Sequence, residues 1–349
     1  MKNKLKHLIP VLLVLAAITG SLSACESESN DQQKVSKQGF YFDTIIQITL
    51  YGTTDEKYID GCFDMAKKYE DMLSNTVTDS EVSRINATAG KEYVTVSADT
   101  LELIKKGIEY GDTSDGRFDI TIGKLSDLWN FSEIAENTDS KDNEVDASVV
   151  PSDTQIQGEL AHVNYHNIQI NGNAVMLTDS EAKLDLGGIA KGFIADKMKA
   201  YLQSQKITSG IINLGGNVLT IGEKSDGSDY TVGIQKPFDE SGEPICTVKI
   251  KDKSVVTSGI YERYYRVDGK LYHHILDTTT GYPVKNNLYS VTIISDSSCD
   301  GDALSTTCFA LGIDKAKELI NSLSGVEAIF VTDDYSIITT SDEYEVSTD

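Results

Sequence analysis

The chain has 349 residues, 40% of them hydrophobic, and a formal net charge of −23 at pH 7. A protein this acidic is repelled by nucleic acid and by anionic lipid surfaces, so we expect no nucleic-acid partner. An anionic substrate would need a local cationic device, most simply a metal ion held by carboxylates. The length suits one large domain or two small ones.

The N-terminus carries the pattern of an export signal. Three lysines among the first six residues precede a short apolar run from Leu8 to Ile18, which is too short to span a bilayer comfortably. The tetrapeptide Leu22-Ser-Ala-Cys25 then has the form of a lipobox. We therefore expect a lipoprotein signal peptide over residues 1–24, with an ordinary signal peptide or a retained membrane anchor as the alternatives.

Cys25 would become the first residue after cleavage and would carry the lipid. Acyl chains on this residue would hold the protein to a membrane surface, which predicts a lipid-anchored protein on the extracytoplasmic face of a bacterial cell membrane. Residues 26–38 are polar and contain no aromatic side chain. They predict a flexible tether over residues 25–38, followed by the folded domain over residues 39–349.

The other four cysteines are Cys62, Cys246, Cys299 and Cys308. They have no paired spacing, and three of the four lie within apolar patterns. This arrangement is typical of small core residues and not of a zinc site or a disulfide framework. A disulfide remains an alternative in an exported protein.

The first part of the mature chain predicts short strands and helices with one apolar face. Residues 39–51 are rich in aromatic and β-branched side chains and predict an opening strand. Apolar residues at helical spacing predict an amphipathic helix from Lys57 to Leu73. A polar turn leads into a short helix capped near Asp79 or Ser80, and a helix from Ser97 to Gly111 follows.

Residues 115–129 form a glycine-bounded segment with the chain's only tryptophan, Trp129. We expect this side chain in the core or on the wall of a cleft. Residues 132–151 are acidic and poor in apolar side chains, and predict a surface insertion. A helix over residues 153–160 and strands over 167–170 and 174–177 are expected next.

The run from Leu184 to Asp196 is the most distinctive stretch of the chain. A short apolar segment carries Asp185, a glycine pair ends at Gly188, and a helical apolar pattern begins at Ile189 with Lys191 in its first turn. A glycine corner before a helix N-terminus suits a phosphate group. Glycine pairs before helices are often simple turns, which is the alternative.

Strands and helices then alternate irregularly, without an internal repeat or a linker. This pattern favours a single α+β domain over a doubly wound parallel sheet. The expected strands cover residues 210–217, 231–235, 246–250, 254–258, 289–295, 326–332 and 336–340, and the expected helices cover residues 300–311 and 313–323.

Seven motifs in a fixed order give the chain a specific resemblance: DSEVSRIN (79–86), GRFDITIG (116–123), LDLGGIAKGFIAD (184–196), INLGGN (212–217), TSGIYER (257–263), HILDTTTGYPV (274–284) and DALSTT (302–307). Over residues 39–349 the chain resembles the ApbE family of FAD:protein FMN transferases. The resemblance implies a single α+β, T-fold-like domain with mixed or antiparallel sheets, packed helices and a cleft for FAD and Mg²⁺. It also implies transfer of FMN from FAD to a Thr or Ser hydroxyl of a target flavoprotein in a membrane redox system, with release of AMP.

The same resemblance assigns metal ligands. Asp302 and Thr306 match the family's ligands, with the backbone carbonyl of Gly188 completing the protein side. Their i, i+4 spacing places both side chains on one face of a helix, and oxygen ligands with few carboxylates suit Mg²⁺. The alternative is that Asp302 caps its own helix and Thr306 faces solvent.

His274 matches the family's functional histidine, and the resemblance implies that it deprotonates the attacking hydroxyl, because histidine ordinarily titrates near neutral pH. A histidine held in an apolar strand by a backbone hydrogen bond is the alternative. Asp277 is expected to orient the imidazole or to face the metal. The resemblance further implies that Asp185 and Lys191 contact FAD, and more loosely Phe118, Asp119, Ile120 and Leu276.

The chain departs from the family pattern at three positions. Phe42 stands where a methionine is common, Thr76 where an aromatic residue is common, and Thr278 where a proline is common. Phe42 and Thr76 are still expected to contact FAD. These departures leave two further functions open, namely an FAD pyrophosphatase that yields FMN and AMP, and a non-catalytic flavin-binding lipoprotein.

Overall fold

The computed structural model describes residues 33–138, 143–239 and 241–348. The expected signal peptide, Cys25 and the first part of the expected tether lie outside these residues. No helix in the described ranges combines the length and the apolarity needed to cross a membrane.

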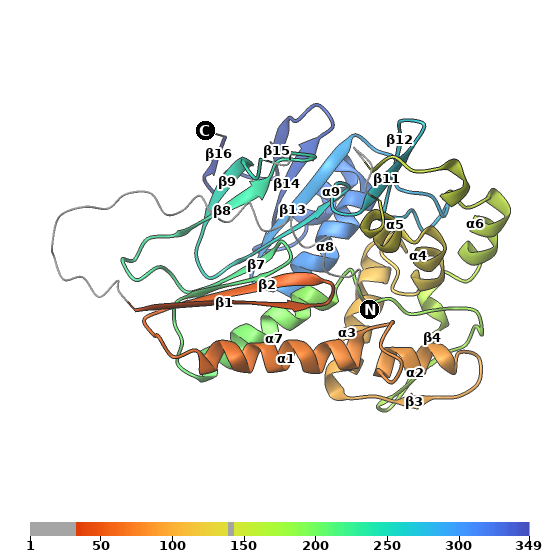
Figure 1. Ribbon diagram of the computed structural model, residues 1–349, viewed down its shortest axis with the longest axis horizontal. Helices are drawn as coiled ribbons and strands as arrows, with labels where there is room; N and C mark the ends of the chain where they lie inside the picture. The colour runs from red at the N-terminus through yellow and green to blue at the C-terminus, as the bar shows by residue number, and fades with distance from the viewer. Residues whose placement is uncertain (1–32, 139–142, 240, 349) are drawn as a thin grey trace.

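A large sheet forms the centre of the molecule (Figure 1). Every strand in it pairs with its neighbours in the antiparallel sense. Antiparallel strands separated by tight turns and packed helices make this an α+β fold, as the sequence predicts. The strand order is β1 (Lys34–Tyr41), β2 (Thr44–Tyr51), β6 (Gly210–Leu214), β7 (Asn217–Ile221), β10 (Ser254–Gly259), β13 (Leu288–Ser295), β14 (Glu327–Thr332) and β15 (Ile337–Thr339).

The first two strands correct the predicted start of the domain. The prediction of a single strand over residues 39–51 is wrong, because the chain turns at Phe42 and Asp43, whose φ angles are 53° and 55°. β1 also begins at Lys34, inside the expected tether, and pairs with β2 from Lys34 onwards. The pairing with β2 provides the backbone hydrogen bonds that order these polar residues.

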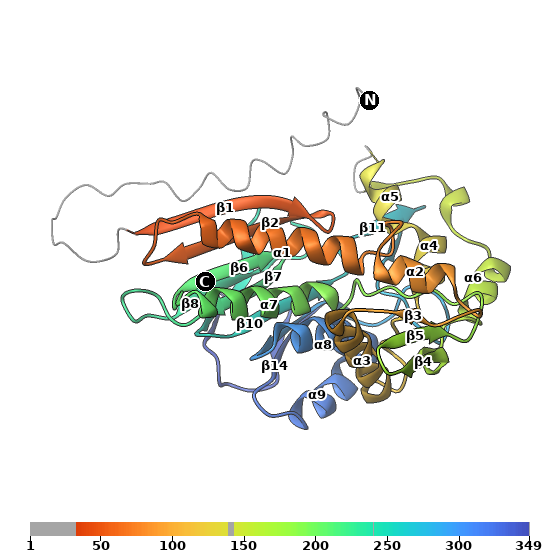
Figure 2. The same ribbon diagram turned by 90° about the horizontal axis from the view of Figure 1, so that it is seen from below.

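Helices cover one face of the large sheet and a small sheet covers the other. Figure 2 shows α1 (Lys57–Leu73), α7 (Ala190–Ser204) and α8 (Ser298–Leu311) across the first face. The small sheet contains β8 (Tyr230–Gln235), β9 (Pro244–Ile250) and β16 (Val346–Ser347). Successive side chains of a strand point to opposite faces, so Val255 of β10 packs with the small sheet and Leu219 of β7 with the helical layer.

The remaining elements surround the helical face. One group packs around Trp129, which is fully buried and donates its Nε1–H to the carbonyl oxygen of Gly281 at 2.8 Å. It includes the hairpin of β11 (Tyr264–Val267) and β12 (Lys270–His273), which turns at Asp268 and Gly269 with φ angles of 50° and 75°. The other elements are α2 (Glu81–Ala87), β3 (Val94–Thr95), α3 (Ala98–Thr113), α4 (Gly123–Trp129), α5 (Phe131–Glu136), η4 (Ala147–Val149), α6 (Asp153–Leu160), η5 (Tyr165–Asn167), β4 (Ile168–Asn171), β5 (Ala174–Leu177) and α9 (Ile313–Asn321).

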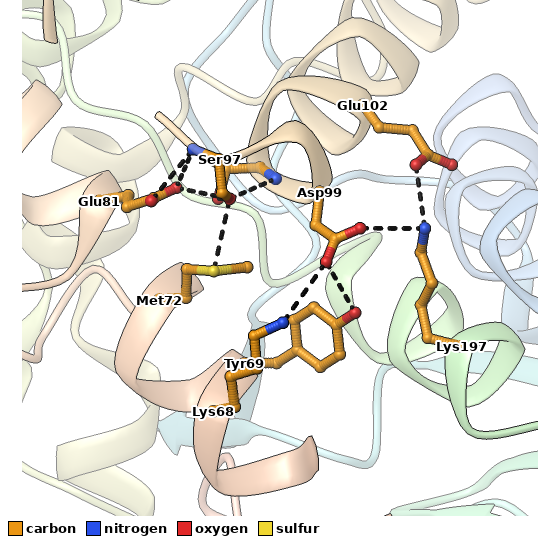
Figure 3. A network of polar contacts seen from close by, with 9 residues as sticks. Lys68, Tyr69, Met72, Glu81, Ser97, Asp99, Glu102 and Lys197 are labelled. Carbon is orange, nitrogen blue, oxygen red and sulfur yellow. Dashed lines mark hydrogen bonds and ion pairs between the residues drawn. The ribbon is translucent and has the colours of Figure 1, made fainter. Parts of the chain in front are cut away.

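A polar network fixes α7 against its neighbours (Figure 3). Lys197 of α7 lies 3.1 Å from Asp99 and 3.0 Å from Glu102, both on α3. Tyr69 of α1 donates its hydroxyl to Asp99 at 3.0 Å. Although burial opposes it, the hydrogen bonds from Lys197 and Tyr69 hold the pKa of Asp99 below its usual value. The three helices are therefore joined at one carboxylate.

The four cysteines of the described residues are free and buried, which confirms their predicted role as small core residues. Burial raises the pKa of the Cys62 and Cys308 thiols to about 12, so these thiols are inert at neutral pH.

Candidate active site

The centre of the candidate site is the contact between the N-terminal ends of α7 and α8. Gly192 lies in the first turn of α7, and a side-chain carbon there would stand 2.1 Å from the carbonyl oxygen of Ser298. Glycine therefore permits this close approach. The backbone N–H of Gly192 donates to a carboxylate oxygen of Asp302 on α8 at 2.9 Å.

The capping is reciprocal. Asp196 of α7 accepts hydrogen bonds from the backbone N–H groups of Ser298 and Cys299, both at 2.9 Å. Each helix thus places a carboxylate at the positive end of the other, where first-turn N–H groups lack partners within their own helix. This arrangement fixes the position of Asp302 in the site.

Asp302 is 5% exposed and lies inside α8, whose N-cap is Ser297. The alternative in which Asp302 caps its own helix is therefore wrong. Burial raises the pKa of Asp302, while the positive charge of Lys191 opposes the rise. One carboxylate oxygen accepts from the N–H of Gly192, and the backbone N–H of Lys191 also stabilises the carboxylate.

The three expected metal ligands come together around Asp302. A side-chain carbon at Gly188 would stand 3.9 Å from Oγ1 of Thr306 and 3.2 Å from the ring of Phe118. Thr306 in turn shares a hydrogen bond of 3.1 Å with the hydroxyl of Ser258 on β10. Thr306 is therefore not simply a solvent-facing residue.

These residues fit a magnesium ion better than a transition metal. The described residues contain no cluster of three His, Cys, Asp or Glu side chains that would hold a metal by themselves. A carboxylate, a hydroxyl and a backbone carbonyl are hard oxygen ligands, and Mg²⁺ usually takes few of these from the protein and keeps water or phosphate in the remaining positions. The donor set of Asp302, Thr306 and Gly188 is of this kind.

Charged side chains of the TSGIYER segment lie close enough to Asp302 and Lys191 to interact with them electrostatically. Desolvation by the surrounding protein atoms raises the pKa of Glu262 to about 7, against the opposing charges of Lys191 and Arg263. The charge of Asp302 adds to the rise. Glu262 has no role among the residues expected from the sequence, where the one signal for it is an acidic and a basic residue side by side in the TSGIYER motif.

His274 and its neighbour His273 have different environments. His273 is 5% exposed; its Nε2–H donates to the carbonyl oxygen of Val284 at 3.0 Å, and its Nδ1 accepts from the N–H of Ile275 at 3.3 Å. His274 is half-buried, and its Nδ1 lies 3.3 Å from the carbonyl oxygen of Arg263. Because a carbonyl oxygen only accepts, Nδ1 of His274 carries the proton and Nε2 keeps its lone pair.

The expected near-neutral pKa of His274 is wrong. Burial lowers the pKa of His274 to about 3, and the positive charge of Arg263 adds to this effect. The imidazole is therefore neutral at physiological pH and able to accept a proton, although its basicity is low.

Asp277 does not orient His274. Its carboxylate lies 3.0 Å from Nη1 of Arg117, and it also accepts from the N–H and hydroxyl of Thr279 at 2.8 and 2.6 Å. The backbone N–H of Asp277 also donates to the carbonyl oxygen of Tyr282. The bonds to Thr279 and Tyr282 stabilise the local turn. The structure thus gives Asp277 a positioning role at the turn in place of the expected contact with the imidazole.

Comparison with known proteins decides the family. The sequence profile of the ApbE family matches residues 42–330. The chain belongs to the ApbE family. An FAD:protein FMN transferase of Klebsiella pneumoniae (strain 342) is 37% identical over 314 residues, which cover 89% of this chain and 93% of that protein.

Other ApbE relatives agree in sequence and in structure. An FAD:protein FMN transferase of Treponema pallidum (strain Nichols) is 29% identical, with 92% and 90% of the two chains covered. The crystal structure of the ApbE protein of Thermotoga maritima superposes with a TM-score of 0.77 at 30% identity, covering 88% of this chain and 96% of that one. The flavin transferase ApbE of Vibrio cholerae gives 0.76 at 28% identity, with 88% and 96% covered.

Within this ApbE fold, three of the looser FAD assignments fall on structural residues. Asp119 is buried, and its carboxylate accepts from the N–H of Thr121 and of Tyr165 at 2.7 and 2.9 Å. The side chain of Ile120 is 1% exposed in the main core, and that of Leu276 packs in the cluster around Trp129. These contacts give the three side chains structural roles, and their expected contacts with FAD stay predictions.

The other expected FAD contacts remain predictions, and the structure gives their surroundings. Asp185 accepts from the N–H of Gly187 at 2.8 Å, which leaves a second carboxylate oxygen. Phe118 packs edge-on against Tyr110 and lies beside Gly188. Phe42 is half-buried at the β1–β2 turn, where its N–H donates to Glu70 at 2.8 Å, and Thr76 is exposed and bonded to Ser74.

Proposed function

We propose that this ApbE chain transfers FMN from FAD to a hydroxyl of a protein acceptor, with release of AMP. The observation that carries the proposal is the meeting of Asp302, Thr306 and Gly188 at the N-terminal end of α7. The names of the ApbE relatives support the same activity, since the curated ones are FAD:protein FMN transferases.

The pyrophosphate of FAD would lie at the start of α7. Lys191 supplies a full positive charge in the first turn, and the helix end contributes a partial one. Asp302, Thr306 and the carbonyl of Gly188 would hold Mg²⁺, which supplies neutralisation of charge on the pyrophosphate oxygens when it is bound. In an otherwise acidic protein, this cleft is where an anionic substrate is tolerated.

His274 would act on the acceptor hydroxyl. The oxygen of a Thr or Ser side chain attacks the phosphorus on the FMN side, the bond from this phosphorus to the AMP oxygen breaks, and the hydroxyl proton moves to Nε2 of His274. The Nδ1–H bond to Arg263 fixes the imidazole in the tautomer that this step needs. Glu262 lies close enough to Lys191 for their charges to interact, and so helps to set the field over the phosphates.

The test uses the full chain with FAD, magnesium chloride and a panel of purified exported flavoproteins that have been stripped of covalent flavin. We expect a covalent, fluorescent FMN on one of them and an equal amount of AMP, and no product when EDTA removes the metal. AMP and free FMN in equal amounts, formed at the same rate without an acceptor, would instead establish an FAD pyrophosphatase. Unchanged FAD under all conditions would leave a flavin-binding lipoprotein.

We also propose that the protein is anchored by lipid on Cys25 to the extracytoplasmic face of the membrane. The lipobox Leu22–Cys25 supports this localisation, and it would place the enzyme beside acceptors of a membrane redox system. The Cys25→Ser variant should move from the membrane fraction to the soluble fraction with unchanged turnover. A variant that stays in the membrane fraction would contradict the lipid anchor.

A further inference from the structure

Two hollows flank the segment Asp277–Lys285. Neither is lined by His274 or by the expected metal ligands Gly188, Asp302 and Thr306. The larger, of about 540 Å³, is lined mainly by hydroxyl and amide side chains. The smaller, of about 200 Å³, gathers cationic side chains. Both are lined by Asp277 and Lys285, so they adjoin across this segment. We call the pair the Asp277 groove.

The smaller hollow is positively charged in a chain of net charge −23. Arg117, Lys285 and Lys315 line it, and Asp277 is its only carboxylate. Arg117 is offset by Asp277 at 3.0 Å. Lys285 and Lys315 are exposed and form no ion pair among the residues that the structure describes. Two positive charges are thus uncompensated at this end of the groove.

The groove is next to the candidate active site. Asp302, Thr306 and Ala310 follow one another at intervals of four residues on α8, and Ala310 lines the smaller hollow. Four residues of a helix rise about 6 Å, so the hollow begins about one turn beyond Thr306. Val284, which also lines the hollow, accepts the hydrogen bond of His273, the neighbour of His274.

The segment that separates the hollows is held rigidly. Trp129 bonds the carbonyl of Gly281, Thr278 donates to the carbonyl of Gly116 at 2.7 Å, and Asp277 bonds Arg117. The groove is therefore preformed, and its occupant would not have to order it.

We infer that the Asp277 groove binds an acidic, extended segment of the acceptor polypeptide, beside the residue that receives FMN. The inference rests on the proposed function, which requires a second, macromolecular substrate next to His274. The phosphates of FAD are already assigned to the start of α7, so the charges of Lys285 and Lys315 are left for the acceptor. Threonine, tyrosine and glutamine side chains of the larger hollow suit the backbone of an extended chain.

Electrostatics favours the approach of such a segment at this groove. The net charge of −23 repels an acidic chain over most of the surface. Screening limits this repulsion to about 8 Å at physiological ionic strength, so local charges decide the contact. An acidic segment is attracted where two uncompensated lysines line one hollow, as Lys285 and Lys315 do here.

The test measures binding to the full chain of two fluorescently labelled synthetic peptides. One has a single threonine flanked by aspartates, and the other has asparagine in place of each aspartate. The test variant is Lys285→Gln/Lys315→Gln. The control, Lys91→Gln/Lys317→Gln, removes the same charge at positions that line neither hollow. The dissociation constant for FAD is measured on every variant by flavin fluorescence.

We expect the aspartate peptide to bind the test variant about threefold to tenfold more weakly than the unaltered chain or the control. The asparagine peptide should bind all three equally and more weakly, and the affinity for FAD should not change. Aspartate-peptide binding that is insensitive to Lys285 and Lys315, or a loss of FAD affinity in the test variant, would overturn the inference.

Failure of the proposed function can be distinguished from failure of the groove inference, because peptide binding needs neither Mg²⁺ nor turnover. Retained FMN transfer with lysine-independent peptide binding counts against the groove alone. For an acceptor that is flavinylated, the test variant should raise its KM by the same factor, with kcat and the KM for FAD unchanged. A fall in kcat with no change in the acceptor's KM would also overturn the inference.

Discussion

The carboxylate of Asp302 accepts a hydrogen bond from the backbone N–H of Gly192 at 2.9 Å, and this bond joins two helices at the site. The carboxylate of Asp302 stabilises the N-terminal end of α7, and in the proposed function its negative charge would also hold the metal. The residue therefore has two separable tasks, one in the fold and one in the chemistry. Substitutions can distinguish them.

Asp302→Asn keeps an oxygen that accepts from Gly192 and removes the negative charge, whereas Asp302→Ala removes both. We expect the alanine variant to lose about 1–3 kcal/mol of unfolding free energy, because the N–H of Gly192 is left buried and unpaired. The asparagine variant should stay within about 1 kcal/mol of the unaltered chain. Both should lose magnesium-dependent FMN transfer by at least about 100-fold. Urea unfolding and AMP release measure the two effects, and an active asparagine variant would contradict the metal assignment.

Gly192→Ala should separate α7 from α8. The added methyl group would meet the carbonyl oxygen of Ser298 at 2.1 Å, so the helices must move apart and the bond to Asp302 must break. We expect a loss of about 1–3 kcal/mol or more and a loss of transfer activity. The matched control is Gly158→Ala on α6, where a methyl group meets nothing within 4 Å. It should gain up to about 1 kcal/mol from helix propensity. Equal effects of the two substitutions would refute the close approach.

His274→Gln should reduce FMN transfer by about 100-fold or more, which is the usual contribution of a general base. The affinity for FAD should survive. Because the pKa of His274 is lowered to about 3, its imidazole stays neutral between pH 7 and pH 5, and its titration should cause no loss of activity in this range. Glu262, whose pKa is about 7, titrates there instead. An inflection of the pH–rate profile near pH 6.5 that persists in Glu262→Gln would contradict this assignment.

His273 should make the protein less stable in acid. Its pKa is lowered from 6.5 to about 4 by burial, so between these values the unfolded chain binds a proton that the folded chain does not. Stability is therefore fully present above pH 6.5 and is lost as the pH falls towards 4, by up to about 3 kcal/mol. His273→Gln should flatten this dependence in urea unfolding at several pH values. The exchange His166→Gln, at an exposed position, is the control, and an unaltered slope in His273→Gln would contradict the prediction.

The link between α3 and α7 in Figure 3 should be measurable as a coupling energy. In a double-mutant cycle of Lys197→Met and Asp99→Asn we expect a coupling of about 0.5–1 kcal/mol, since both side chains are less than a third exposed. The pair Lys249 and Glu345 has a similar distance of 2.8 Å but is more than half exposed. Its coupling should be close to zero, and a value equal to that of the buried pair would refute the role of burial.

Local patterns in the sequence predicted much of the fold. The helix from Lys57 to Leu73 has the predicted bounds because its apolar residues recur at helical spacing. The turn at Phe42 and Asp43 was missed, since it contains neither glycine nor asparagine. For the site, the spacing of Asp302 and Thr306 correctly placed both on one helix. The glycine pair before α7 could also be recognised in the amino-acid sequence.

The remaining features depend on residues distant in the sequence. The bond between Gly192 and Asp302 spans 110 positions, and the partner of Asp277, Arg117, is 160 positions away. No local pattern identifies such a partner, so Asp277 was assigned to the neighbouring histidine. The low pKa of His274 has the same origin, because burial and the charge of Arg263 arise only when the chain is folded.

The hairpin of β11 and β12 leads into the two adjacent histidines. His273 is the last residue of β12 and is bound within the core, whereas His274 follows the strand and bonds the carbonyl oxygen of Arg263, which precedes β11. The tight turn at Asp268 and Gly269 sets how β12 pairs with β11, because turn length sets the register of a hairpin. One residue inserted in that turn would shift both histidines by one position against β11 and separate the imidazole of His274 from its carbonyl partner. The chain would keep every residue named above and lose the arrangement that we propose for FMN transfer.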